Sequence, residues 1–119
     1  MKKNDFLDLY DRSMPRNMLD LIDAVIETEL FFNSQSLQFI YSSKQEMNAA
    51  INRAMHICRN MGLPLERHFR ISYISDHSQH AVLQVWKMSK AAYYLTIING
   101  DPDNPMVSRM QWELIKKML

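Results

Sequence analysis

The chain has 119 residues, a formal net charge of +1, 47% apolar residues and 23% charged residues. This length is typical of one domain and can bury a core without a metal ion or a disulfide, so residues 1–119 are expected to form a single domain. Two glycines are too few for the tight turns of a β-sandwich or barrel, and no apolar run approaches the length of a membrane span. Because Cys58 has no partner for an internal disulfide and the charged first residues lack the apolar core of a signal peptide, we expect a cytoplasmic protein with no membrane partner.

Charge is unevenly distributed along the chain. Residues 1–43 carry a net charge of −3, residues 44–70 carry +3, and residues 71–119 carry +1. A nucleic-acid footprint is therefore expected in the middle third. The overall balance is too small to argue for nucleic acid by itself.

The first third is predicted to contain a polar arm and one amphipathic helix. Residues 1–13 are polar and are expected to form either a short helix or a mobile arm. A helix is predicted from Pro15, and its apolar residues at helical spacing predict a side that faces the core, with a partner-binding helix as the alternative. These apolar residues are Met18, Leu21, Ile22, Val25 and Ile26. The apolar run 30–32 either ends this helix or forms a brief strand.

The middle third is predicted to contain a long helix with two different sides. The run Ser43-Lys44-Gln45-Glu46 has the pattern of a capping box, in which the serine and the glutamate satisfy each other's backbone amides, and the helix is expected to run to Met61 and stop at Gly62. Its apolar stripe is predicted to face the core and consists of Met47, Ala50, Ile51, Ala54, Ile57, Cys58 and Met61. Its opposite side is polar and consists of Lys44, Asn48, Asn52, Arg53, His56, Arg59 and Asn60. With a short helical turn over 37–40 before it, the pair has helix-turn-helix proportions, and a solvated helix face is the alternative.

The last third is predicted to contain a β-hairpin and two helices. Residues 71–74 and 81–86 read as strands around a polar turn. Ser89 is the expected N-cap of a helix with apolar positions at 91, 92, 95 and 98, and Gly100 is the expected left-handed residue that ends it. Asn104 and Pro105 predict the start of a final helix over 105–119. The fold class is therefore α+β, mainly helical, with a small hairpin between the long central helix and two C-terminal helices.

The run from Met88 to Pro105 resembles the signature of the family of DNA-damage-inducible protein D and the Bro-N-type phage antirepressor domains. That signature reads roughly Leu-Ser-Arg-Tyr-Ala-Cys-Tyr-Leu, a few apolar residues, and then Asn-Gly-Asp-Pro-basic-basic-Pro. The residues in register with it are Ser89, Ala92, Tyr94, Leu95, Asn99, Gly100, Asp101, Pro102 and Pro105. The segment 31–37 is similar to the family's Tyr-Trp-Ser-Ala-Arg-Asp-Leu, in which the aromatic pair closes a strand and the rest opens a short helix. Residues 41–62 also resemble the family without a gap, and the pair His68-Phe69 recurs in it. The matching residues in this segment are Tyr41, Ser42, Ala50, Ile51, Ala54, Cys58, Asn60 and Gly62.

The resemblance covers residues 31–112 and implies a regulatory domain in DNA-related processes, such as the DNA damage response or phage antirepression. It implies either direct contact with nucleic acid or control of a protein that makes that contact. Three departures remove or alter cations that the family usually keeps, at Gln35, Lys90 and the pair Asp103-Asn104. Because binding to phosphates weakens as cations are lost, these departures argue against strong DNA binding.

Residues that suggest enzymatic or metal chemistry are few. His77 and His80 share a polar turn, but no cysteine or carboxylate pair stands at ligand spacing with them, so a solvated turn is favoured. Cys58 lies in an apolar stripe, which favours an inert thiol over a nucleophile. Asp101 and Asp103 resemble the opening of a calcium loop, but its glycine and glutamate positions are not matched, so this corner is interpreted as structural. No catalytic residue, metal or cofactor is expected.

Two functions remain as candidates. In the first, DNA is bound through the middle third, with phosphates contacted by Lys44, Arg53, Arg59, Arg67 and Arg70 and bases contacted by Asn48 and Asn52. In the second, the chain is a protein-interaction or antirepressor-like module without direct DNA contact, acting as a homodimer or on a regulatory protein. Its contact surface would consist of Met106, Met110, Trp112 and Leu114.

Overall fold

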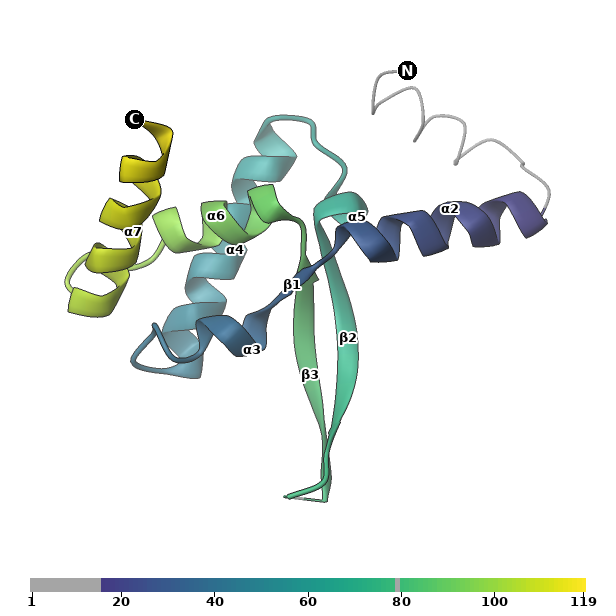
Figure 1. The fold of residues 1–119 in the computed structure, drawn as a ribbon, viewed down its shortest axis with the longest axis horizontal. Coiled ribbons are helices and arrows are strands. Elements are labelled where there is room, and N and C mark those ends of the chain that lie inside the picture. The colour runs from purple at the N-terminus through teal and green to yellow at the C-terminus, as the bar shows by residue number, and fades with distance from the viewer. Residues whose placement is uncertain (1–15, 79) are drawn as a thin grey trace.

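The computed structural model describes residues 16–78 and 80–119 (Figure 1). In chain order the elements are α2 (Arg16–Glu29), β1 (Phe32–Asn33), α3 (Ser34–Leu37), α4 (Lys44–Asn60), α5 (Leu65–His68), β2 (Phe69–Asp76), β3 (Ala81–Met88), α6 (Lys90–Ile98) and α7 (Pro105–Met118). The predicted α+β class, mainly helical with a hairpin between the long helix and two C-terminal helices, is confirmed. The arm expected over 1–13 lies outside the described residues, as do Pro15 and the side chains of Met18 and Ile22.

Helix starts follow the predicted capping residues. Ser89 Oγ accepts a hydrogen bond from the backbone N–H of Ala92 at 3.1 Å, and Asn104 Oδ1 accepts from the N–H groups of the first turn of α7. At α4, Ser43 Oγ accepts from the N–H of Glu46 at 3.1 Å. The carboxylate of Glu46 accepts from the backbone N–H of Ser42 at 3.1 Å, so the return bond of the capping box is made one residue earlier than predicted.

The two glycines act for different reasons. Gly62 ends α4 with φ of 70°, the left-handed conformation that glycine adopts without strain. Gly100 does not have a positive φ, so the prediction of a left-handed residue after α6 is wrong. A Cβ at Gly100 would stand 2.6 Å from Cγ1 of Val107 and 3.0 Å from Cε1 of Tyr41. Glycine is therefore needed there because α7 and the segment before α4 approach the backbone closely.

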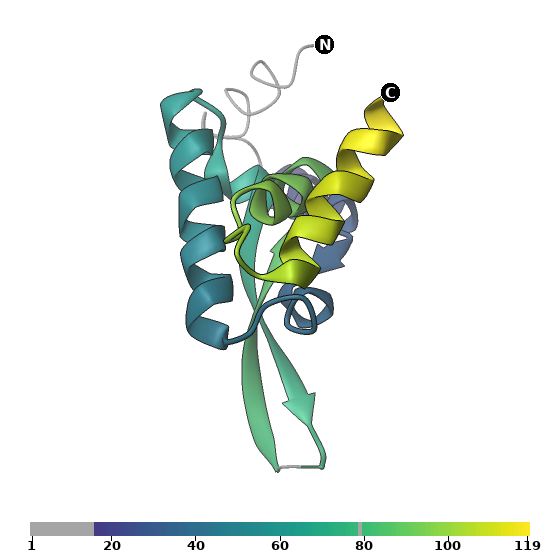
Figure 2. The same cartoon turned by 90° about the vertical axis from the view of Figure 1, so that its left-hand side faces the viewer.

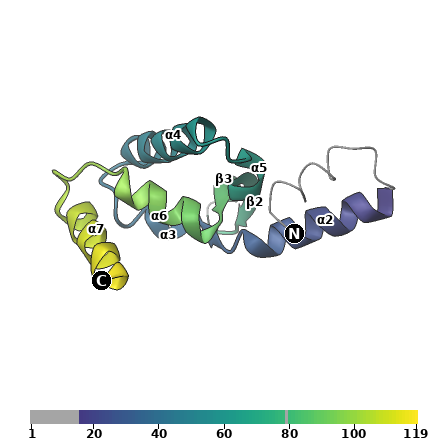
Figure 3. The ribbon, with the colours of Figure 1, turned by 90° about the horizontal axis from the view of Figure 1, so that it is seen from above.

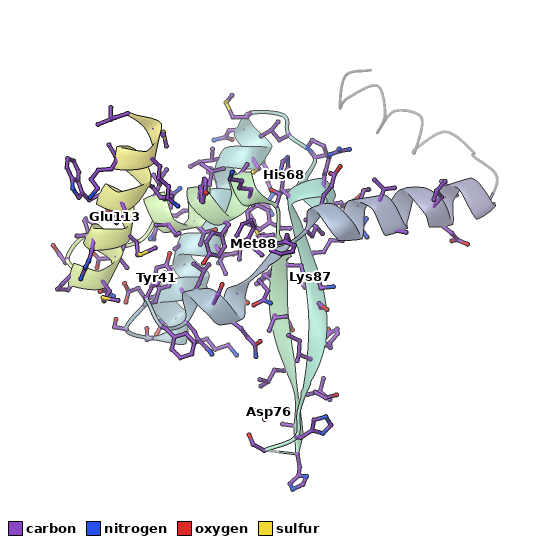
Figure 4. All side chains as sticks on the ribbon, in the orientation of Figure 1. Tyr41, His68, Asp76, Lys87, Met88 and Glu113 are labelled. Atoms are coloured by element: carbon purple, nitrogen blue, oxygen red, sulfur yellow. The ribbon has the colours of Figure 1, made fainter. Side chains whose placement is uncertain are left out.

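The sheet consists of a long hairpin with a short third strand at its base. β2 and β3 pair antiparallel from Phe69↔Met88 to Asp76↔Ala81, and β1 pairs with the base of β3. The strand order is β1-β3-β2. The hairpin projects below the helices in Figure 1, and Figure 4 places Asp76 near its tip and Lys87 and Met88 at its base.

The core lies between the base of the hairpin and three helices. α6 packs against both α4 and α7, and Figure 2 shows it between them. The predicted stripe of α4 is largely buried, at Met47, Ala50, Ile51, Ala54 and Cys58, whereas Met61 is exposed. In α6 the buried side chains are Ala92, Thr96 and Ile97, and two of the four apolar positions at helical spacing, 91 and 98, are exposed. Thr96 is accommodated because its hydroxyl donates to the carbonyl oxygen of Ala92 at 2.9 Å.

α2 departs most from its predicted packing. Ile26 and Leu30 are buried near its C-terminal end, whereas Leu21 and Val25 are exposed. Seen from above, α2 and α7 lie at opposite ends of the molecule (Figure 3). The radius of gyration is 16.1 Å, whereas a compact chain of this length would have one of about 13.5 Å. This difference arises because α2 and the hairpin both extend beyond the core.

Candidate nucleic-acid interface

The polar side of α4 is exposed along the whole helix. Lys44, Asn48 and Asn52 follow one another at four-residue spacing and therefore lie along one side of the helix. Arg53 and Arg59 are also exposed and continue this surface toward the C-terminal end of α4. We call these five residues the α4 polar face. They combine three cations with two amide side chains on one rigid element.

A hollow of about 400 Å³ separates α4 from β3. The α4 side of the hollow is formed by Lys44, Asn48 and Asn52. The hairpin side is formed by Gln84 and Trp86, which are two residues apart in β3 and therefore point to the same side of the sheet. Gln84 is a candidate that the sequence interpretation missed, because nothing in a single strand tells which helix will lie beside it.

Arg53 is held in place by the end of α6. Its Nε donates to the backbone carbonyl oxygen of Asn99 at 2.9 Å, and its Nη2 donates to the same oxygen. This carbonyl belongs to the C-terminal end of α6, where backbone acceptors lack helical partners. Arg53 therefore joins α4 to α6 and also lines a second hollow, of about 530 Å³, together with Asn52, His56 and Arg59.

Arg67 and Arg70 do not lie on the α4 polar face. Arg67 is buried, and its Nη2 lies 3.0 Å from a carboxylate oxygen of Glu29, so its charge is balanced by the acidic first third. Arg70 donates from Nε to the carbonyl oxygen of Glu66 at 3.1 Å. Arg70 is paired across the hairpin with Lys87, which is next to Trp86 in β3 and therefore points away from the hollow. Because directly opposite residues share a side of the sheet, Arg70 also points away from the hollow.

The helix-turn-helix interpretation is not matched by the packing. α3 is separated from α4 by residues 38–43 and packs mainly against β1 and β3. The element that packs most closely on α4 is α6. The α4 polar face is therefore presented by a helix supported by α6 rather than by a preceding helix.

The four residues assigned to a protein interface are divided by the structure. Trp112 and Met106 are exposed, but they lie on different sides of α7. Met110 is partly buried and packs on the core, and Leu114 is a core residue with 5% of its surface exposed. The exposed apolar residues that do share a side are Trp112 and Ile115 of α7, spaced three residues apart, and the C-cap residue Leu119, four residues further along.

Reactive and metal-binding groups are not gathered into a site in the described part of the chain. No group of three histidine, cysteine or carboxylate side chains suited to a metal ion occurs within 16–78 and 80–119. His77 and His80 are exposed in the hairpin turn. Cys58 is buried, and burial raises the pKa of its thiol, as expected for an inert cysteine. Asp101 Oδ1 accepts from the backbone N–H of Asp103 at 2.9 Å, which agrees with its interpretation as a turn-stabilising residue.

Tyr41, which lies shortly before α4, has a hydroxyl that loses its proton at an unusually high pH. Its hydroxyl donates to the carbonyl oxygen of Thr96 at 2.9 Å, and burial, reinforced by the charge of Glu46, raises its pKa to about 12. We expect its phenolate absorbance to appear near pH 12 and to be missing in Tyr41→Phe. In the unfolded chain the pKa of this side chain is 10.0, so the folded state holds the hydroxyl proton more tightly than the unfolded state. The resulting contribution to the free energy of unfolding is complete below pH 10.0 and is lost as the pH rises toward 12. Denaturant titrations at intervals between these pH values should show a smaller loss of stability in Tyr41→Phe, and an equal loss would contradict the assignment.

Comparisons of the chain with protein-family models, with curated proteins and with solved structures found no match. In the described ranges, no helix has both the length and the apolar character needed to cross a bilayer.

Proposed function

We propose that the chain is a non-enzymatic regulatory domain in DNA-related processes that contacts nucleic acid through the α4 polar face. The observation that carries the proposal is the alignment of Lys44, Asn48 and Asn52 along one exposed side of a single helix, with Arg53 and Arg59 beside them. The resemblance of residues 31–112 to the damage-inducible D and Bro-N-type domains supports the same class of function. A cytoplasmic location is part of this proposal.

The dimensions of α4 suit the major groove. Its 17 residues make a helix about 25 Å long, and the major groove of B-DNA admits an α-helix. The cations would contact phosphates, and the two asparagines would read base edges, since an asparagine amide can make paired hydrogen bonds to adenine. Gln84, across the hollow from Asn48, would contact the same strand from the hairpin side.

Arg67 and Arg70 have no part in this surface. Arg67 is buried against Glu29, and Arg70 lies on the opposite side of the hairpin. Three cations remain, which predicts weak binding with a slope of log affinity against log salt of about −2.7 on duplex DNA. The domain would therefore bind well only at low salt or as part of a larger assembly.

The test removes two cations whose side chains make no hydrogen bond within the described ranges 16–78 and 80–119. We expect Lys44→Ala combined with Arg59→Ala to lower affinity for a labelled random duplex at least tenfold at low salt and to reduce the salt slope by about 2. Fluorescence anisotropy over a series of salt concentrations measures both quantities. Lys116→Ala combined with Lys117→Ala removes two cations from α7 and is the matched control, expected to leave the slope unchanged. Equal losses in the two double variants would show that binding does not use the α4 polar face.

A second candidate, the protein-interaction module, is favoured by the exposed apolar residues Trp112 and Ile115 of α7 and by the C-cap residue Leu119. Large apolar side chains that share one side of an exposed helix are typical of contact surfaces for other proteins. This candidate would be preferred if the chain binds neither duplex nor single-stranded DNA at low salt. A regulatory partner would then be sought with Trp112→Ser as the control variant.

A further inference from the structure

β2 is an edge strand of the sheet in the part of the chain that the structure describes. The order β1-β3-β2 places it at one side of the sheet, with no further strand beside it among the described residues. Eight residues long, it contains no proline and no lysine, two residues that commonly protect such edges, and its charged residues Arg70 and Asp76 stand near its two ends. Figure 1 shows its lower part standing clear of the helices. Its outward backbone groups are therefore a template for pairing with another strand.

The hairpin also exposes apolar side chains near this edge. Tyr73 is 68% exposed and Ile71 is 47% exposed, and they point to the same side of the sheet as Val82. Side chains of this kind on an isolated hairpin are expected to be covered by a partner. The chemistry of the strand itself indicates which partner.

We propose that β2 pairs antiparallel with β2 of a second copy of this chain, about a two-fold axis that passes beside Tyr73. The two sheets then form one six-stranded sheet in the order β1-β3-β2-β2-β3-β1. Residues directly opposite each other in an antiparallel pair share a side of the sheet, and a two-fold axis gives the same residue the same side in both copies. An even-numbered residue can therefore lie opposite only an even-numbered residue of the second copy, and an odd-numbered residue opposite only an odd-numbered one. This inference concerns assembly and does not depend on the proposed nucleic-acid function.

Charge complementarity selects one of these registers. With Tyr73 opposite its own copy, Arg70 lies opposite Asp76 of the second copy, and the symmetry makes this ion pair twice. Ile71 then lies opposite Ser75, and Ser72 lies opposite Ile74. Sliding the strands by two residues in one direction places Arg70 opposite Ile74, and sliding them in the other direction places it opposite Ser78. Either slip loses both ion pairs.

The positions of the two charged groups are fixed by local bonds. Arg70 Nε donates to the carbonyl oxygen of Glu66 at 3.1 Å, which anchors it near the base of the hairpin. Asp76 Oδ1 accepts from the backbone N–H of Ser78 at 3.1 Å and from its hydroxyl at 2.6 Å, which anchors it near the tip. Opposite charges at the two ends of one strand are self-complementary in an antiparallel pair.

The register can be tested by cross-linking. Under mild oxidation we expect Tyr73→Cys to form a covalent dimer, because directly opposed residues have Cα atoms about 4.5–5.5 Å apart. In the same register the Cα atoms of two Ile71→Cys chains are about 14 Å apart, so that variant alone should not cross-link. A mixture of Ile71→Cys and Ser75→Cys chains should cross-link. The native Cys58 is buried and gives the background in the unmodified chain.

A charge exchange tests the same contact without a covalent bond. Sedimentation equilibrium should show that Arg70→Asp and Asp76→Arg each weaken the dimer at least tenfold, and that the double variant recovers most of the affinity. Circular dichroism melting shows whether each variant is folded, and the cysteine variants decide the matter if a single charge variant is not. A monomer at all concentrations, equal cross-linking of Ile71→Cys and Tyr73→Cys, or a dimer that only Trp112→Ser disrupts would each overturn the proposal.

Discussion

Replacing Gly100 by alanine should lower the melting temperature by about 10 °C, the result of roughly 2–3 kcal/mol of lost stability. The added Cβ would lie 2.6 Å from Cγ1 of Val107 and 3.0 Å from Cε1 of Tyr41, and both of these side chains are buried. Neither can move away without disturbing the contact of α7 or of the segment before α4. Thermal unfolding followed by circular dichroism measures the effect.

Two further variants separate crowding from a general intolerance of alanine. A Cβ added at Gly62 would have no atom within 4 Å, so Gly62→Ala should cost only the strain of the left-handed backbone conformation, about 1–2 kcal/mol of stability. Val107→Ala removes the atom that the new Cβ would strike. The double variant Gly100→Ala, Val107→Ala should therefore lose less stability than the sum of its single variants. Simple additivity would contradict the crowding explanation.

Replacing Leu37 by alanine should cost about 2–5 kcal/mol, even though α3 is a single turn of helix. Leu37 is 0% exposed and belongs to the same core as α4 and α6, so truncation leaves a cavity that the tightly packed neighbours cannot fill. Urea unfolding should show the midpoint falling with little change in slope.

Phe39 is the matched control, since it stands two residues away and is larger. It is 79% exposed, so Phe39→Ala should change stability by about 0.5 kcal/mol or less. A larger effect at Phe39 than at Leu37 would mean that the loop after α3 packs differently from the arrangement described here.

Local features of the fold were predictable because local chemistry determines them. Ser43, Ser89 and Asn104 begin helices by accepting hydrogen bonds from the backbone of the following turn, and this requires only neighbouring residues. The hairpin was equally predictable, because residues of the strand-forming types stand on both sides of a polar turn and those of the first strand alternate. Gly100 shows the limit of such reasoning, because its role depends on Val107 and Tyr41, which approach it only in the folded chain.

The candidate site was predictable as one side of α4 but not beyond it. Helical spacing placed Lys44, Asn48 and Asn52 together, and the structure shows all three exposed. Arg67 is not part of the α4 polar face because it is paired with Glu29, which stands 38 residues earlier in the chain, and no local pattern links the two residues. In α7, Trp112 and Leu114 are both large and apolar, and only packing on α6 determines which one is buried.

The pairing of β1 with the base of β3 has a consequence for the order in which the protein assembles as it is made. Phe32 and Asn33 find their partners only at Met88 and Lys87, so this ladder cannot close until residue 88 has left the ribosome. Until then, the apolar residues around β1 stay exposed while α4, whose bonds are local, can already form. A nascent chain halted shortly before Met88 would therefore carry a formed central helix and an unclosed sheet, and such exposed apolar surface is what chaperones bind.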